Sequence, residues 1–150
     1  MVFSDISFME EAIKEAKIAL KENEIPIGAV IVYKNRIIGR GHNQTERLKD
    51  PTAHAEIIAI SSACNYLNNW RLKDATIYIT CEPCLMCLGA ILLARIKRVV
   101  YGTKEEKFGI FSNYSKLYES IKERIEVIEG IKEEECKELL KMFFQNKRSK

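Results

Sequence analysis

The feature that most constrains this chain is segment 81–87, which reads CEPCLMC and places three cysteines and a glutamate within seven residues. The chain has five cysteines, an odd number, and three of them crowd into this segment. We therefore expect no disulfide framework and a reducing, cytoplasmic setting. Cysteines spaced in this way serve either as metal ligands or as small buried residues. If they bind a metal, the fold must bring further ligands to this segment.

The rest of the chain is typical of one soluble domain, which we expect to cover 1–150. We find no internal repeat, linker or low-complexity tract, and 150 residues suit a single core. No apolar run is long enough to span a bilayer, and no secretory signal is visible. The formal charge of +3 permits an anionic partner without requiring one.

Apolar periodicity and turn signals predict that strands alternate with helices after an opening helix and a β-hairpin. A capping box of Ser7 and Glu10 is expected in the first helix, and Asp50-Pro51 is expected to open the second. The expected helices cover 7–23, 50–66, 84–96, 113–121 and 132–148, and the expected strands cover 25–33, 37–41, 75–80, 98–102 and 124–130. This order predicts an α/β fold, a mixed sheet with helices on both faces.

Cys84 and Cys87 follow Pro83 at a spacing that puts both thiols on one face of a helix start. Unpaired N–H groups and the helix dipole favour thiolate there, which is the form that binds zinc. The chain has two histidines, and one of them, His54, lies in PTAHAE near the start of another helix. Two helix starts at one sheet edge can converge on one metal. His54, Cys84 and Cys87 then supply three ligands and leave a fourth position for water, which indicates a catalytic zinc.

Two neighbouring side chains have alternative interpretations. Cys81 is either a fourth ligand or part of a pocket wall or core; we favour the second because it ends a strand whose alternation need not point it at the metal. His42, in the loop GRGHN, is either a ligand or a surface or turn residue, and we again favour the second.

Glu56 is the residue that suggests a reaction. It lies two residues after His54, and residues at that spacing do not share a helix face. Its carboxylate reaches a metal-activated water only if the metal lies beyond the helix end. The alternative is a solvated first-turn glutamate that the helix dipole favours. Next to the ligand pattern, we interpret Glu56 as the general acid and base.

The segments HAE at 54–56 and PCLMC at 83–87 resemble the zinc signature of the nucleobase deaminases. Within that superfamily the chain resembles the bacterial tRNA adenosine deaminases along nearly its whole length. The segments that carry the resemblance are IPIGAVIV, GHN, DPTAHAEI, WRLKDATIYIT, EPCLMC, ARIKRVVYG and ECKELLKMFF. Guanine and cytosine deaminases share much of the zinc signature, whereas RIKRVVYG and the tail from Glu129 onward favour the tRNA enzymes.

The resemblance implies a cytidine-deaminase-like fold with three α/β/α layers around a five-stranded sheet. Residues 113–121 would be the crossover that makes the last two strands parallel. It also implies a homodimer with one zinc per chain, each site being bordered by the neighbouring subunit. The implied reaction is hydrolytic deamination of adenosine to inosine at the wobble position of a tRNA anticodon loop.

The implied substrate contacts come from several segments. Asn43, otherwise a turn residue, would hydrogen-bond the base or ribose, and Ile27 would pack near it. Glu105 and Lys107 lie in a loop that borders the substrate in the family, where an aspartate usually stands at the position of Glu105. This loop lacks the family's second glycine, and the segment after it is shorter. The basic tail residues Lys147 and Arg148 would contact the RNA backbone.

Two other functions compete with this one. A deaminase for a free base or nucleoside, of the guanine or cytosine type, would share the zinc and Glu56 but would not need the basic tail. A non-catalytic, zinc-stabilised RNA-binding subunit would not need Glu56.

Overall fold

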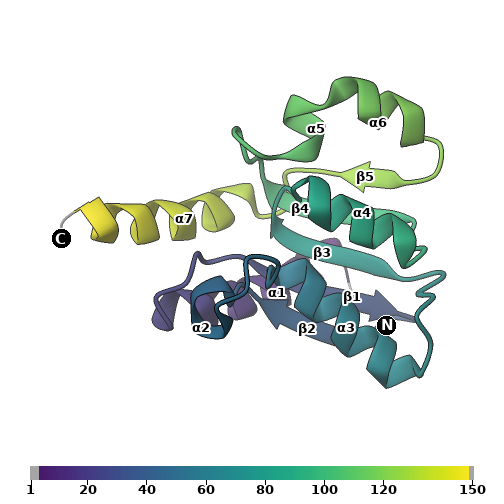
Figure 1. The fold of residues 1–150 in the computed structure, drawn as a ribbon, viewed down its shortest axis with the longest axis horizontal. Coiled ribbons are helices and arrows are strands. Elements are labelled where there is room, and N and C mark those ends of the chain that lie inside the picture. Colours follow the sequence, from purple (N-terminus) through teal and green to yellow (C-terminus); the bar gives the residue numbers. More distant parts are fainter. Residues whose placement is uncertain (1–3, 149–150) are drawn as a thin grey trace.

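The computed structural model describes residues 4–148, with the backbone alone for Arg148. Helices and strands alternate along the chain from the second strand onward (Figure 1). The helices are α1 (Asp5–Lys21), α2 (Thr45–Leu48), α3 (Ala55–Leu67), α4 (Leu85–Leu93), α5 (Ile110–Asn113), α6 (Ser115–Ile121) and α7 (Glu133–Arg148). The strands are β1 (Gly28–Tyr33), β2 (Arg36–His42), β3 (Thr76–Cys81), β4 (Arg98–Thr103) and β5 (Glu126–Ile128).

The five strands form one mixed sheet in the order β2-β1-β3-β4-β5. β1 pairs antiparallel with β2 and with β3, whereas β3, β4 and β5 run parallel. Helix α4 connects β3 to β4, and α5 and α6 connect β4 to β5, so the last two strands are parallel as the resemblance implied. The carboxyl ends of β3 and β4 therefore lie at the same edge of the sheet.

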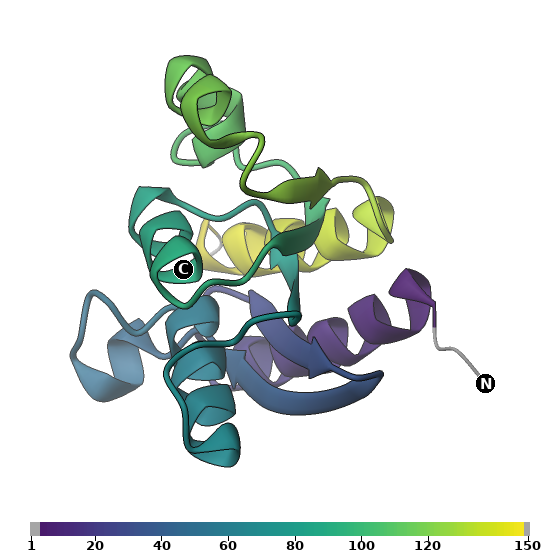
Figure 2. The same cartoon turned by 90° about the vertical axis from the view of Figure 1, so that its right-hand side faces the viewer.

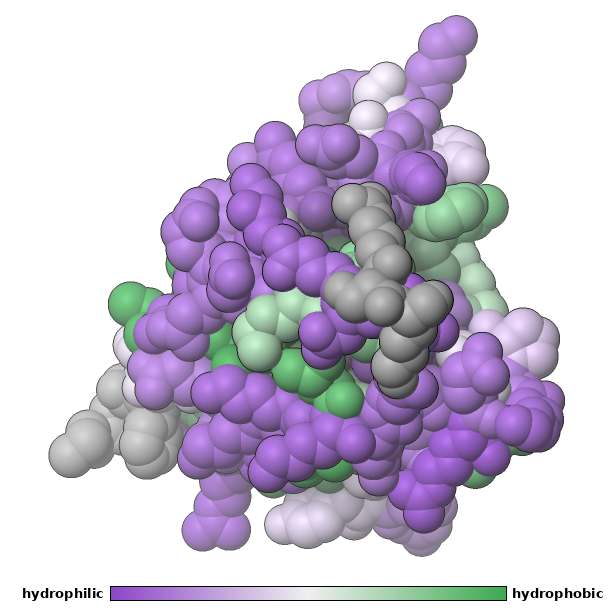
Figure 3. Space-filling view, turned by 90° about the vertical axis from the view of Figure 1, so that its left-hand side faces the viewer, coloured by the Kyte–Doolittle hydropathy of each residue, from purple (hydrophilic) through white to green (hydrophobic). Residues whose placement is uncertain are grey.

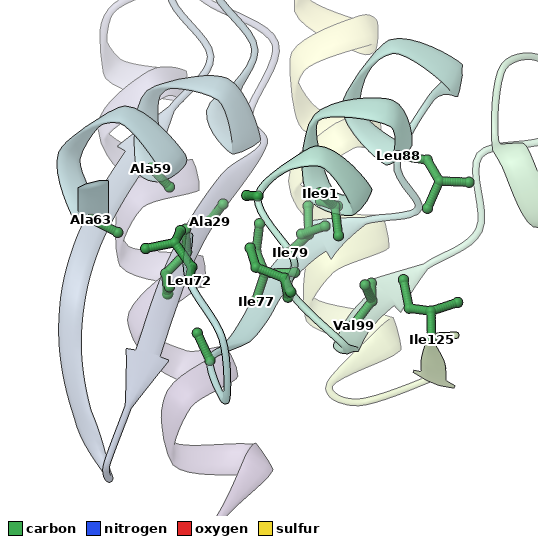
Figure 4. Packing of buried hydrophobic residues seen from close by; sticks show 14 of the residues in the cluster. Ala29, Ala59, Ala63, Leu72, Ile77, Ile79, Leu88, Ile91, Val99 and Ile125 are labelled. Atoms are coloured by element: carbon green, nitrogen blue, oxygen red, sulfur yellow. The ribbon is translucent and has the colours of Figure 1, made fainter. Parts of the chain in front are cut away.

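Helices cover both faces of this sheet, as the strand and helix alternation predicted (Figure 2). On one face, α3 and α4 pack through small and branched side chains on alternate residues of the strands, among them Ala59, Ile91, Ile77 and Ile79 (Figure 4). On the other face, α1 and the first half of α7 cover the remaining strand positions, such as Val30 and Val100. The result is the three-layer α/β/α fold that the sequence resembles.

Helix α3 approaches the edge strand β2 closely because β2 has glycines at the positions that face the helix. A Cβ at Gly41 would lie 2.5 Å from the carbonyl oxygen of Ala55, and one at Gly39 would lie 2.4 Å from that of Ala59. A larger residue at either position would displace the helix backbone. The glycines thus fix the start of α3, and with it His54, against the sheet.

The helix starts differ from the sequence expectations. Ser4, rather than Ser7, caps α1, and its hydroxyl accepts the N–H of Ser7 at 3.2 Å. Helix α3 begins at Ala55 and not at Asp50, because the Asp50 carboxylate accepts the N–H of Thr52 at 2.8 Å and closes a turn. The short helices α2 and α5 were not expected. Over the described range, none of the helices has the length and apolar character needed to cross a membrane.

Candidate active site

The starts of α3 and α4 meet at the carboxyl edge of the sheet. His54 is the residue before α3 and Cys84 is the residue before α4, and neither side chain caps its own helix. The imidazole Nδ1 of His54 lies 3.7 Å from the Sγ of Cys84 and 3.5 Å from the Sγ of Cys87. In the part of the chain that the structure describes, these three residues are the cluster able to hold a metal, with ligand atoms within 4.8 Å of one another.

The two nitrogen–sulfur distances fit a tetrahedral metal. Zinc with Zn–N of about 2.05 Å and Zn–S of about 2.3 Å separates neighbouring N and S ligands by about 3.6 Å. The two observed Nδ1–Sγ distances lie on either side of that value. Cys81, although buried, is not part of the cluster, so a metal held by these three residues would keep one position for a solvent molecule. This is the donor set of a catalytic rather than a structural site.

The electrostatics of the cluster also suit a cation. The pKa of the Cys84 thiol falls to about 4, because Cys87 donates a hydrogen bond to its sulfur and His54 interacts with it as well. The same hydrogen bond raises the pKa of Cys87, and burial adds to this effect. Hydrogen bonding to Cys84 raises the pKa of His54. A metal ion would take the place of the protons that these groups share.

Glu56 lies in the first turn of α3 and lines the same pocket as His54 and Cys84. Its side chain is 4% exposed, which excludes a solvated surface glutamate. Burial raises the pKa of its carboxyl to about 7. Because His54 precedes the helix, the ligand cluster lies beyond the helix end, where a first-turn carboxylate can face it. A carboxyl group that titrates near neutrality can both accept and donate a proton.

The pocket around these groups has a volume of about 670 Å³, within the usual range for small-molecule sites. Four of the six predicted substrate contacts line it: Ile27, Asn43, Glu105 and Lys107. Asn43 is buried, and its backbone N–H donates to the carbonyl of Ile27 at 3.1 Å. The carboxylate of Glu105 is turned back onto its own loop, where it accepts the N–H of Phe108.

The other two predicted contacts lie further out along α7. The ammonium of Lys147 is 5.2 Å from the centre of the Phe143 ring, away from the pocket lining. Arg148 ends α7, and its side chain lies outside the described residues. Of the adjacent aromatic pair, Phe143 is 5% exposed and packs inward, whereas Phe144 is 46% exposed and lines the pocket.

Cys81 and His42 are placed differently from each other. Cys81 is buried at the end of β3 and forms part of the pocket wall, as we favoured. His42 is not a surface or turn residue: it ends β2, and its two ring nitrogens lie 3.1 Å from Glu15 and 2.8 Å from Glu22. These carboxylates hold the strand that leads into Asn43.

A second groove, of about 790 Å³, adjoins the pocket between α7 and the loop that follows β4. Four exposed lysines line it: Lys104, Lys107, Lys137 and Lys141. Glu105, Lys107, Leu140 and Phe144 belong to both hollows, so the two are continuous. In Figure 1, α7 extends beyond the sheet on the left, and the view from that side shows apolar surface in a hollow framed by hydrophilic side chains (Figure 3).

Sequence reasoning missed several pocket residues. Leu140 on α7 and Phe108 on the loop line the pocket, and their apolar character alone did not distinguish them from core residues. Glu24 and Glu82 are buried glutamates that accept backbone N–H groups of segments next to the pocket, Glu24 from Arg47 at 2.7 Å and Glu82 from Glu105 at 3.1 Å. The weak signal was available at Glu82, which directly precedes Pro83 and Cys84.

A three-layer α/β/α fold with a His-Cys-Cys cluster and a buried glutamate at two helix starts defines the class of metal-dependent deaminases. The model of the MafB19-like deaminase family matches residues 3–148. The chain belongs to this deaminase family.

Individual relatives agree with the family. The chain is 45% identical over 148 residues to the tRNA-specific adenosine deaminase of Bacillus subtilis (strain 168), covering 97% of this chain and 92% of that protein. Among solved structures, one from a study of A-to-I editing by tRNA:A34 deaminases is 42% identical, with a TM-score of 0.83, covering 89% of this chain and 99% of that one. The guanine deaminase of Bacillus subtilis is 39% identical with a TM-score of 0.66, covering 78% of this chain and 76% of that one.

Proposed function

We propose that this protein is a zinc-dependent hydrolase that converts adenosine to inosine at the wobble position of a tRNA anticodon loop. The observation that carries the proposal is the buried Glu56 beside the cluster of His54, Cys84 and Cys87, whose ligand atoms lie within 4.8 Å of one another. The substrate follows from the 45% identity to a tRNA-specific adenosine deaminase over nearly the full chain. The cytoplasm, where tRNA and reduced thiols occur together, is the corresponding location.

His54, Cys84 and Cys87 would hold one zinc per chain. Zinc, when bound, makes a water molecule reactive at neutral pH. Glu56 takes a proton from the attacking water and passes it to ring nitrogen N1 of adenine while C6 gains the oxygen. Glu56 then takes the proton of the new C6 hydroxyl group and transfers it to the C6 amino group, which leaves as ammonia. Adenosine and water thus give inosine and ammonia, and Glu56 returns to its starting state.

The pocket walls orient the base for this transfer. The buried side chain of Asn43 is proposed to hydrogen-bond the base or ribose, and Ile27 packs near the base. The adenine must leave its stack to enter a pocket of this kind, which costs a few kcal/mol in a helix and less in a loop. An anticodon loop therefore suits the site better than duplex RNA.

The groove lined by Lys104, Lys107, Lys137 and Lys141 is proposed to hold the RNA strand that flanks the target base. Lysine side chains bind phosphates as point charges. Three glutamates, Glu105, Glu106 and Glu133, also line the groove, so the lysines must contact phosphates individually and not as a uniform positive surface. Lys147 and Arg148 would extend the track along α7.

A second copy of the chain is the proposed occupant of the outer face of α4. This helix has no polar side chain except Cys87, and its outward residues Leu85 and Leu93 are 52% and 69% exposed. No atom lies within 4 Å of where a Cβ at Gly89 would be, so a neighbouring helix has room to approach. Leu93→Glu should convert a dimer to a monomer in light scattering; a wild-type monomer would refute the homodimer.

A deaminase for free guanine is the second candidate function, because a guanine deaminase structure is 39% identical to this chain, although the 45% identity to a tRNA-specific adenosine deaminase favours the tRNA function. Measuring ammonia release from adenosine, guanine, cytosine and an anticodon stem-loop separates the candidates. We expect release from the stem-loop above all. Release from guanine alone would replace the tRNA function with the free-base function. If no substrate released ammonia, the protein would be a non-catalytic RNA-binding subunit, although a buried Glu56 argues against that.

A further inference from the structure

Glu82 is a buried carboxylate that the proposed proton transfers do not use. It follows β3, directly before Pro83 and Cys84, and it is 4% exposed. Its Oε1 accepts the backbone N–H of Glu105 at 3.1 Å and the hydroxyl of Ser112 at 2.6 Å. Its Oε2 accepts the backbone N–H of Ser112 at 2.7 Å. One carboxylate therefore holds both ends of a single segment, residues 105–112.

That segment brings substrate-facing side chains to the pocket. Lys107 and Phe108 lie between the two ends that Glu82 holds, and both line the pocket. Phe108 is 69% exposed. Lys107 also lines the second groove, called the lysine groove after Lys104, Lys107, Lys137 and Lys141. A further tie comes from the N–H of Ile110, which donates to the carbonyl of Pro83 at 2.9 Å. The loop is thus fastened to the same short stretch that leads into the ligand Cys84.

Gly109 allows the loop to lie this close to the carboxylate. A Cβ at Gly109 would be 2.4 Å from the Cδ of Glu82 and 2.5 Å from its Oε1. Real Cβ atoms do not approach so closely, so any other residue would push either the loop or the carboxylate away. Gly109 of the loop and the carboxylate of Glu82 are therefore in direct contact.

We propose that Glu82 is a positioning residue that fixes residues 105–112 so that Lys107 and Phe108 meet the single-stranded RNA beside the target base. This inference rests on the proposed function of the site. Single-stranded RNA is bound by stacking of unpaired bases on aromatic rings and by lysine contacts to phosphate. An ionised carboxylate suits the role because it is acceptor-only and can satisfy three donors, whereas a glutamine amide would present an NH2 group to one of them.

Hydrogen exchange measured by mass spectrometry tests the positioning directly. Glu82→Gln should speed amide exchange over residues 105–112 about tenfold or more, because a hydrogen bond to a charged group contributes at least that factor. Zinc content should not change. Ser112→Ala, a milder variant that leaves Glu82 in place, should shift exchange in the same segment by a smaller factor. Unchanged exchange in both variants would overturn the proposal.

Asp5→Asn is the matched control, because Asp5 is also a hydrogen-bonded carboxylate. It accepts from Arg98 at 2.8 Å and from Tyr78 at 2.7 Å near the amino ends of β3 and β4, the edge opposite the pocket. This variant should destabilise the protein without changing exchange at 105–112. Faster exchange in the control as well would mean that general loosening, and not Glu82, governs the loop.

A double-mutant cycle on stem-loop binding tests the functional consequence. Glu82→Gln should raise KM and Kd about tenfold with little change in kcat, and Lys107→Ala should add little in the Glu82→Gln background, because both act through one loop. Fully additive losses would overturn the proposal. If exchange responds as expected but the wild-type protein neither binds nor deaminates the stem-loop, the RNA function is wrong and the loop-holding role of Glu82 stands.

Discussion

The lysine groove predicts a specific salt dependence for RNA binding. Each lysine that neutralises a phosphate of single-stranded RNA contributes about −0.7 to the slope of log affinity against log salt. Four lysines line the groove, so the slope from this surface reaches about −2.8. Between about 50 and about 200 mM salt, such a slope lowers affinity about fifty-fold. Replacing Lys137 and Lys141 with glutamine should halve the slope and reduce the loss to about sevenfold.

The assay is fluorescence anisotropy of a labelled anticodon stem-loop across that salt range. The matched control is the pair Lys34→Gln and Arg36→Gln, which removes the same charge at the β1–β2 turn, at the end of the hairpin opposite Ile27 and Asn43. The control should keep the wild-type slope. If the groove variant and the wild type share both slope and affinity, the RNA does not follow α7 and the proposed track is wrong.

Three further predictions concern the metal, the proton-transferring Glu56 and the stability of the fold. Elemental analysis should find one zinc per wild-type chain and much less in Cys87→Ala, while Cys64→Ala keeps it; full zinc in Cys87→Ala would refute the ligand set. Glu56→Gln should keep zinc but lose about a hundred- to ten-thousand-fold in turnover, and near-normal rates would make Glu56 a bystander. Hydrogen bonds from Arg98 lower the folded-state pKa of Asp5, so this carboxylate stabilises the fold above its unfolded pKa of about 4, and the stability is lost as pH falls through the lower folded value. The difference in Tm between wild type and Asp5→Asn should therefore shrink on acidification, and a constant difference would contradict the assignment.

Much of the fold followed from local pattern. Strands and helices alternate with clear periodicity, and the parallel order of the last strands followed from the family resemblance. The errors lie at the short helices α2 and α5, which were not expected, and at helix starts, where one hydrogen bond decides between neighbouring residues. Asp50 closes a turn with Thr52, and Ser4 accepts the N–H of Ser7, and neither choice is visible in apolar spacing.

The candidate site, like the fold, was predictable from the sequence only in part. That His54, Cys84 and Cys87 come together was predictable, because their residue types and spacing match those of metal ligands, and Glu56 was singled out because it stands beside His54. Their roles as ligands and as proton carrier stay predictions. The roles of Glu82 and Glu24 were not predictable, because the sequence does not show whether a glutamate is buried or solvated until the segment that covers it is known. Phe144 and Leu140 reach the pocket only through the direction in which α7 leaves the sheet, which no local pattern encodes.

The most direct test of the central claim is inosine formation at the wobble adenosine of an anticodon stem-loop, measured by nucleoside mass spectrometry with the zinc-loaded protein. The proposed function predicts one inosine per stem-loop at that position, formation at least about a hundredfold slower with Glu56→Gln, and little conversion of free adenosine or guanine. Rapid conversion of guanine with an unmodified stem-loop would contradict the claim and assign the same buried site to a free base.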